Sequence, residues 1–173
     1  MIVSCPRLSK SLKKKVPWLA NSLPLLCIIT AGACAELMSK RLLDKITVHI
    51  EFIHDPNSSY GFCEYIDDFY RPREFKLILN VGTIHNQVNL LLTAVHECFH
   101  VAQFATERLY QYAKRNRVMR WEGKAYSVVG LTSKQISKMP WEKEAYKGEE
   151  KLFLKLIDKL EKAFDGNKNL LAE

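Results

Sequence analysis

Three features are missing from this sequence of 173 residues, and each absence excludes a class of protein. There is no internal repeat and no low-complexity segment, which excludes repeat and fibrous architectures. There is no CxxC pair, and the five cysteines are an odd number, so free thiols in a reducing compartment are favoured over a disulfide framework. No clean apolar run reaches about twenty residues, so we expect no transmembrane span.

The composition is that of one folded domain. Hydrophobic residues make up 47% of the chain and charged residues 26%, which argues against wholesale disorder. The formal net charge of +7 favours acidic partners, of which nucleic acid is the commonest. Because the lysines are divided between an N-terminal cluster and the C-terminal region, a solvated surface is the favoured interpretation and nucleic acid a weakly supported partner.

The N-terminal region has two interpretations. A basic stretch ending at Lys15, apolar residues 23–32 and small residues 33–35 together resemble a secretory signal with its cleavage site. Proline and asparagine interrupt the apolar run, and the helical pattern continues past the supposed cut, so we favour a first helix of the fold, capped by Ser22. We therefore expect a cytoplasmic protein; the alternative is a secreted one that loses residues 1–35.

The middle of the chain predicts a small antiparallel sheet of about three strands. Residues 46–52 alternate apolar and polar side chains and lead into a turn signal. Residues 61–66 and 74–80 form two further strand patterns. Together with the helices before and after them, these strands predict an α+β fold.

Two helices are predicted after the strands. Residues 87–109 carry apolar side chains at helical spacing, with His96 and His100 on an adjacent stripe. Residues 110–139 look irregular and are interpreted as an active-site loop region. Pro140 suits the first turn of a helix that runs to about residue 165.

The chemistry is carried by the run His96-Glu97-Cys98-Phe99-His100, which matches HExxH on a predicted helix. A separation of four residues places both imidazoles on one helix face, within reach of a single zinc ion. Glu97 then lies beside the metal, where it can act as general base toward a water that the metal activates. The alternative, two surface histidines without a metal, is disfavoured because the apolar neighbours should bury this turn.

Such a site needs a third protein ligand, and no histidine lies downstream of the motif. Glu142 shares the helix stripe that must face the core and the metal helix, so we choose it as the third ligand. Glu144 falls on a different stripe and is expected to point to water. Glu142 would also suit the helix start through the macrodipole, which does not exclude ligation.

An HExxH followed about forty residues later by a helical ExxA resembles the gluzincin branch of the zincin metallopeptidases. More narrowly, the chain is similar to small single-domain peptidase-like proteins of tailed phages. That similarity rests on PRxF at 72–75, HExxHxxQ at 96–103, RWxGxxY at 120–126 and PWExEAY at 140–146. It implies a minimal zincin-like domain with one zinc per chain that hydrolyses protein or peptide substrates.

The resemblance also implies details of organisation. It covers roughly residues 37–164, and we divide the chain into a basic N-terminal segment 1–22, a zincin-like domain 23–165 and a tail 166–173. By the same analogy, the last strand before the metal helix, 74–80, would pair with an extended substrate.

The oxyanion-stabilising histidine of larger gluzincins has no counterpart in this sequence. Tyr126 and Tyr146 are candidate replacements, although core packing is the favoured interpretation for both. Gln103 is expected either to orient a metal ligand or to be an ordinary buried amide. Cys98 is interpreted as a core thiol. Arg120 and Trp121 suit a cation and aromatic surface, which nothing in the sequence requires.

Two competing functions stand beside the peptidase. The first is a catalytically inactive, basic binding module that zinc merely staples, with nucleic acid or a protein as partner. A three-ligand site with a retained Glu97 argues against it, because structural zinc usually has four protein ligands. The second is a peptidase that acts on DNA-associated proteins. Salt-dependent retention on DNA would distinguish it.

Overall fold

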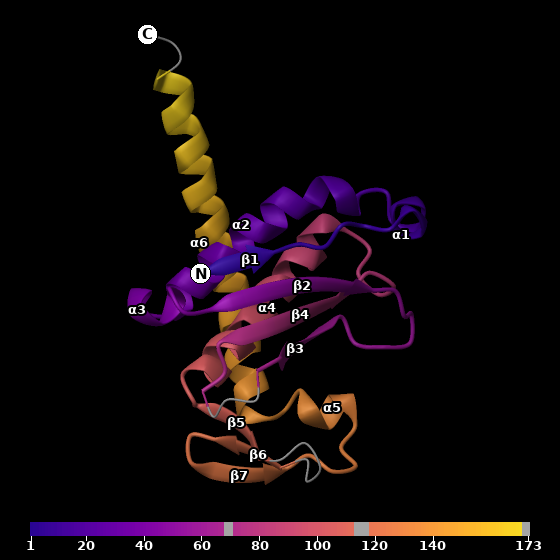
Figure 1. Ribbon diagram of the computed structural model, residues 1–173, viewed down its shortest axis with the longest axis vertical. Helices are drawn as coiled ribbons and strands as arrows, with labels where there is room; N and C mark the ends of the chain where they lie inside the picture. Colours follow the sequence, from indigo (N-terminus) through magenta and orange to yellow (C-terminus); the bar gives the residue numbers. More distant parts are fainter. Residues whose placement is uncertain (68–70, 113–117, 171–173) are drawn as a thin grey trace.

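The computed structural model describes residues 1–67, 71–112 and 118–170. Four strands form the main sheet in the order β1-β2-β4-β3 (Figure 1). The strands are β1 (Ile2–Ser4), β2 (Thr47–Ile53), β3 (Gly61–Tyr65) and β4 (Glu74–Asn80). The predicted α+β class agrees with this mixture of strands and helices.

The prediction of an antiparallel sheet is wrong for most of its pairings. Strand β4 pairs antiparallel with β3, but β2 pairs parallel with both β1 and β4. Alternation of side chains identifies a strand but specifies neither its neighbours nor its direction. In β4 all four residues from Leu77 to Asn80 are buried, which is typical of a central strand.

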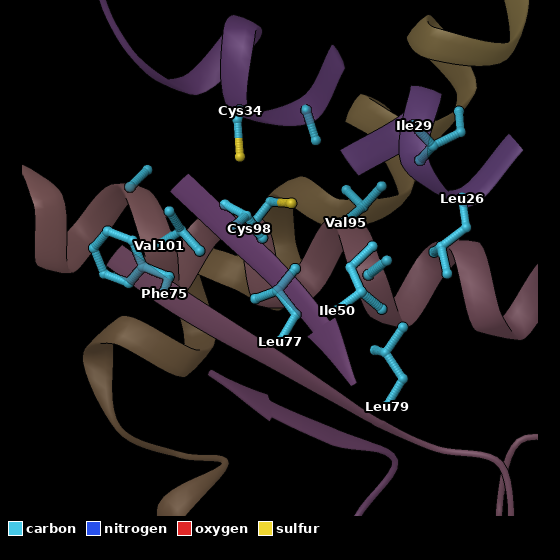
Figure 2. Packing of buried hydrophobic residues seen from close by; sticks show 14 of the residues in the cluster. Leu26, Ile29, Cys34, Ile50, Phe75, Leu77, Leu79, Val95, Cys98 and Val101 are labelled. Atoms are coloured by element: carbon cyan, nitrogen blue, oxygen red, sulfur yellow. The ribbon is translucent and has the colours of Figure 1, made fainter. Parts of the chain in front are cut away.

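Helices α2 (Leu19–Leu37), α4 (Gln87–Ala105) and α6 (Pro140–Leu170) accompany this sheet. Helix α4 packs against β3, β4, α2 and α6, so it lies at the centre of the molecule. Figure 2 shows Leu26 and Ile29 of α2 and Val95 of α4 in one cluster with Leu77 of β4. The C-terminal part of α6 extends beyond the rest of the molecule (Figure 1).

The N-terminal part of the chain differs from its prediction in several bounds. Ser22 is not a cap: α2 begins at Leu19, and the buried Ser22 hydroxyl donates to the carbonyl of Trp18. The helix ends at Leu37, and α3 (Lys40–Leu43) is a separate turn. Before α2, a short helix α1 (Lys10–Lys15) carries the basic cluster, and β1 adds to the sheet. Segment 1–22 therefore packs with the rest of the fold.

Helix α2 is long and apolar enough to cross a membrane by length and composition, a test that buried core helices and signal sequences also pass. Leu19, Leu26 and Ile29 on this helix are fully buried in the core. The cytoplasmic location and the lack of a membrane span therefore remain predictions.

The prediction of irregular structure for 110–139 is wrong for the part that the structure describes. A second sheet forms there from β5 (Leu109–Tyr112), β6 (Val118–Trp121) and β7 (Lys124–Ser127), all antiparallel. A short helix α5 (Ser133–Ile136) follows it. These strands are four residues each, too short for alternation to stand out from the basic and glycine residues around them.

Asn80 is fully buried at the end of β4 and organises the loop before β3. Its Oδ1 accepts hydrogen bonds from the backbone N–H groups of Asp55 and Gly82, each at 3.0 Å. Its Nδ2 donates to the carbonyls of Asp55 and Ser59, at 2.6 and 2.9 Å. One amide therefore ties the 54–60 loop to the main sheet.

Asn80→Ala is expected to lower the free energy of unfolding by about 3 kcal/mol, because it leaves several backbone groups without partners. Urea denaturation measures the change. The control is Asn57→Ala in the exposed part of the same loop, expected to stay within about 0.5 kcal/mol of the parent. A loss below about 1 kcal/mol for Asn80→Ala would show that the loop is held by other contacts.

Candidate metal centre

The structure brings His96, His100 and Glu142 together, as the sequence predicts. The two histidines lie one turn apart on α4, and Glu142 lies in the first turn of α6. Nε2 of His96 is 3.4 Å from Oε2 of Glu142, and Nε2 of His100 is 3.5 Å from its Oε1. One candidate ligand atom from each residue lies within 4.8 Å of the others. The group therefore has the spacing of a three-ligand metal site.

The other nitrogen of each imidazole is held by a second residue. Nδ1 of His96 lies 2.5 Å from Oε2 of Glu149, and Nδ1 of His100 lies 2.8 Å from Oε1 of Gln103. Such partners orient an imidazole so that its Nε2 faces the metal. Of the two interpretations of Gln103, the structure favours the orienting one. Glu149 was not singled out from the sequence, although it lies two turns after Glu142 on the same stripe.

Glu144 does not simply point to water, which corrects the sequence prediction. Its Oε2 accepts a hydrogen bond of 2.8 Å from Nε2 of Gln103, and its Oε1 accepts one of 2.8 Å from Arg108. The same guanidinium binds Glu122 at the β6–β7 turn and lies 4.7 Å above the Trp121 ring. A polar chain thus connects the second sheet to His100. The helical wheel of α6 alone does not reveal it, because Arg108 lies between α4 and β5.

Glu97 is 3% exposed and faces the N-terminal end of β3. Its Oε2 has no hydrogen-bond partner among the described residues, although buried carboxylate oxygens normally have one. A Cβ on Gly61 would lie 3.2 Å from Oε1 of Glu97 and 3.0 Å from Cγ2 of Thr93. The absence of a side chain at Gly61 therefore leaves room beside the carboxylate.

A pocket of about 900 Å³ opens over the three candidate ligands and Glu97. Its walls come from β3 and the residues before it, from α4, α5 and α6, and from the second sheet. It is a size typical of sites that bind small molecules or peptide side chains.

The two candidate tyrosines differ in their position relative to the pocket. Tyr146 is 52% exposed, lines the pocket and packs its ring on His96 with centroids 4.6 Å apart. The core interpretation of Tyr146 is therefore wrong. Tyr126 packs edge-on against Trp141, at 5.7 Å, and is not among the pocket residues.

Other residues singled out from the sequence lie away from the ligands. Arg120 stacks on Tyr110 at 5.6 Å, not on Trp121, because successive strand residues face opposite sides. Cys98 is fully buried, as predicted for a core thiol. His49, a histidine upstream of the motif, also lies elsewhere and binds Ser4 and Glu74 on the main sheet.

Within the part of the chain that the structure describes, the free edge beside the pocket belongs to β3, so the assignment of the substrate-pairing edge to 74–80 is wrong. Strand β4 is flanked on both sides, by β2 and β3. The N–H of Asn80 binds the carbonyl of Tyr60, and the N–H of Ile66 binds that of Glu74, so even-numbered β3 residues bond to β4. The backbone groups of Gly61 and Cys63 therefore point to the open edge.

The charges of the site shift one another's pKa values. Burial works against the charged form of His96, but hydrogen bonds to Glu142 and Glu149 outweigh it and raise the pKa of His96 to about 10. The pKa of His100 is raised too: burial lowers it, but the hydrogen bond to Glu142 and the negative charges of Glu97 and Glu142 together outweigh the burial. Burial raises the pKa of Glu97 despite the two histidines. The raised pKa values of the two histidines therefore favour their doubly protonated forms, whose Nε2 proton competes with a metal.

Metal affinity is accordingly expected to rise with pH across the neutral range. A proton on Nε2 of His96 or His100 blocks ligation. For each proton that the metal displaces, the apparent association constant for the metal rises about tenfold per pH unit. Competition against a chelating dye at pH 6, 7 and 8 measures this slope. A constant affinity over that range would show that neither histidine is protonated in the metal-free protein, or that neither binds the metal.

Comparison with known proteins adds no relative: no protein-family model, curated protein or solved structure matches this chain.

Proposed function

We propose that this protein is a zinc-dependent metallopeptidase in which His96, His100 and Glu142 hold one zinc ion and Glu97 is the general base. The observation that carries the proposal is the conjunction of a His-His-Glu group with the buried carboxylate of Glu97, whose Oε2 has no hydrogen-bond partner among the described residues, both opening into one pocket. Two histidines and one glutamate are a ligand set of catalytic zinc, which leaves a coordination position open. A fourth ligand would instead favour a structural staple, and the described residues place none within the group.

When bound, the zinc supplies a Lewis acid that polarises the peptide carbonyl and activates a water. Glu97 accepts a proton from that water as its oxygen attacks the carbonyl carbon. The proton then passes from Glu97 to the departing amine as the C–N bond breaks. Tyr146, beside His96 at the pocket, is our candidate donor to the developing oxyanion.

We assign substrate binding to the free edge of β3. The backbone N–H and C=O groups of Gly61 and Cys63 are available for strand addition, which binds an extended peptide independently of its sequence. Because Gly61 lies against Glu97, a peptide on this edge would pass directly over the general base.

The test is hydrolysis of an unfolded protein by the zinc-loaded chain, compared with zinc-loaded Glu97→Gln. Hydrolysis by the parent alone supports the proposal. If both proteins bind zinc and neither hydrolyses the substrate, the inactive binding module becomes the favoured function. Salt-dependent retention on DNA is then the next assay.

A further inference from the structure

The pocket over the candidate ligands has two chemically different ends, and β3 runs between them. At the end near Gly61 the walls include Ser59, Tyr60, Asn89 and Thr93, which are polar or exposed. Tyr60 is 60% exposed, so this end is open to solvent.

The other end lies beside the second sheet and has four large apolar side chains in its walls. They are Phe104 at the end of α4, Leu109 of β5, Met119 of β6 and Trp141 of α6. The region of α5 also lines the pocket, with the apolar Ile136 and the polar Ser133, Lys134 and Ser137. Phe104, Leu109 and Trp141 are each less than a tenth exposed. The ring of Tyr65, at the C-terminal end of β3, meets Phe104 edge-on at 5.4 Å. This end therefore offers a buried apolar surface that faces the same cavity as the metal group.

The direction of β3 relates these ends to a bound peptide. The strand begins at Gly61, beside Glu97, and ends at Tyr65, beside Phe104. Antiparallel pairing is the more stable arrangement per residue, so a peptide on this edge is expected to run opposite to β3. Residues before the bond at the metal then lie toward Phe104, and residues after it lie toward Tyr60.

We propose that the substrate carries a large apolar side chain on the amino side of the scissile bond, held between Phe104, Leu109, Met119 and Trp141. Cleavage then follows residues such as leucine and phenylalanine. This inference rests on the proposed function and adds to it a substrate class and a binding direction. It also gives the second sheet a role, because Leu109 and Met119 come from that sheet.

The test uses the zinc-loaded full chain and peptides that differ at one position, with leucine, phenylalanine, alanine or aspartate on either side of a central bond. Mass spectrometry identifies the bond that is cut. We expect cleavage on the carboxyl side of leucine and phenylalanine, with kcat/KM at least about tenfold above that for aspartate. Cleavage on the amino side of the apolar residue, or equal rates for leucine and aspartate, would overturn the proposal.

A paired variant tests the residues. Met119→Gln places an amide in the apolar end, and the ratio of kcat/KM for leucine over aspartate peptides is expected to fall about tenfold, mainly through KM. Because the ratio is taken within one protein, a partly unfolded preparation does not change it. The control is Val88→Gln on the exposed side of α4, which is not among the pocket residues. An unchanged ratio in Met119→Gln would overturn the assignment.

A binding assay separates failure of this inference from failure of the proposed function. Zinc-loaded Glu97→Gln is titrated with the same peptides, labelled, and fluorescence anisotropy reports binding. If the parent cuts no peptide, the peptidase proposal fails, and a preference for leucine over aspartate peptides in this titration still supports the apolar end. Equal binding of both peptides overturns it.

Discussion

His96→Ala is expected to reduce the zinc affinity of this protein by more than about a hundredfold, so that purified variant protein holds almost no zinc. Loss of an orienting partner alone typically costs 10 to 100-fold in metal affinity, and loss of a ligand costs more. The parent is expected to hold about one zinc per chain, because one His-His-Glu group is found among the described residues. Elemental analysis after dialysis against a weak chelator measures both.

Two further variants make the zinc measurement specific. Glu142→Ala is expected to lose zinc as His96→Ala does, since both carboxylate oxygens lie within 3.5 Å of a histidine Nε2. His54→Ala, at an exposed position that does not line the pocket, is the matched control and is expected to retain zinc. Full zinc content in His96→Ala would contradict the metal site. Circular dichroism distinguishes loss of zinc from loss of the fold.

Glu97→Gln is expected to retain zinc and to lower kcat by about 10² to 10⁴-fold, the range that general base catalysis typically contributes. Glutamine preserves the volume of the side chain but cannot accept the proton. Oε2 of Glu97 has no hydrogen-bond partner among residues 1–67, 71–112 and 118–170, so little hydrogen bonding is lost on substitution. Steady-state hydrolysis of a quenched fluorescent peptide, with zinc content measured on the same sample, provides both values.

The control for Glu97→Gln is Glu150→Gln, which removes one carboxylate from an exposed position on α6. It is expected to change neither zinc content nor kcat by more than about twofold, as for surface substitutions generally. If Glu97→Gln kept the activity of the parent, another group would have to be the base. If it lost zinc, Glu97 would instead be part of the metal site.

Local periodicity was sufficient to predict the central group of residues. Four residues separate His96 from His100, which is one helical turn, and the wheel of α6 places Glu142 on its packed stripe. Each of these inferences uses only the spacing of side chains within a single helix. The strands β2, β3 and β4 were found in the same way, from patterns within each segment.

What the sequence could not provide is the relation between segments. The parallel direction of β2 and β4, and the free edge on β3, depend on which strands become neighbours in space. The roles of Glu149 and Glu144 depend on His96 and Gln103, which lie on another helix. Pairings between elements arise from tertiary packing and leave no period in the chain.

The proposed third ligand, Glu142, comes from a helix far along the chain from the two histidines. A zinc ion shared by α4 and α6 is therefore a cross-link, and it closes a loop that contains the whole second sheet and α5. Closing such a loop removes chain entropy from the unfolded state, and a metal that binds only the folded state adds stability in proportion to the logarithm of its concentration. In a zinc-poor cell, both the amount of folded protein and its activity would then depend on the zinc supply.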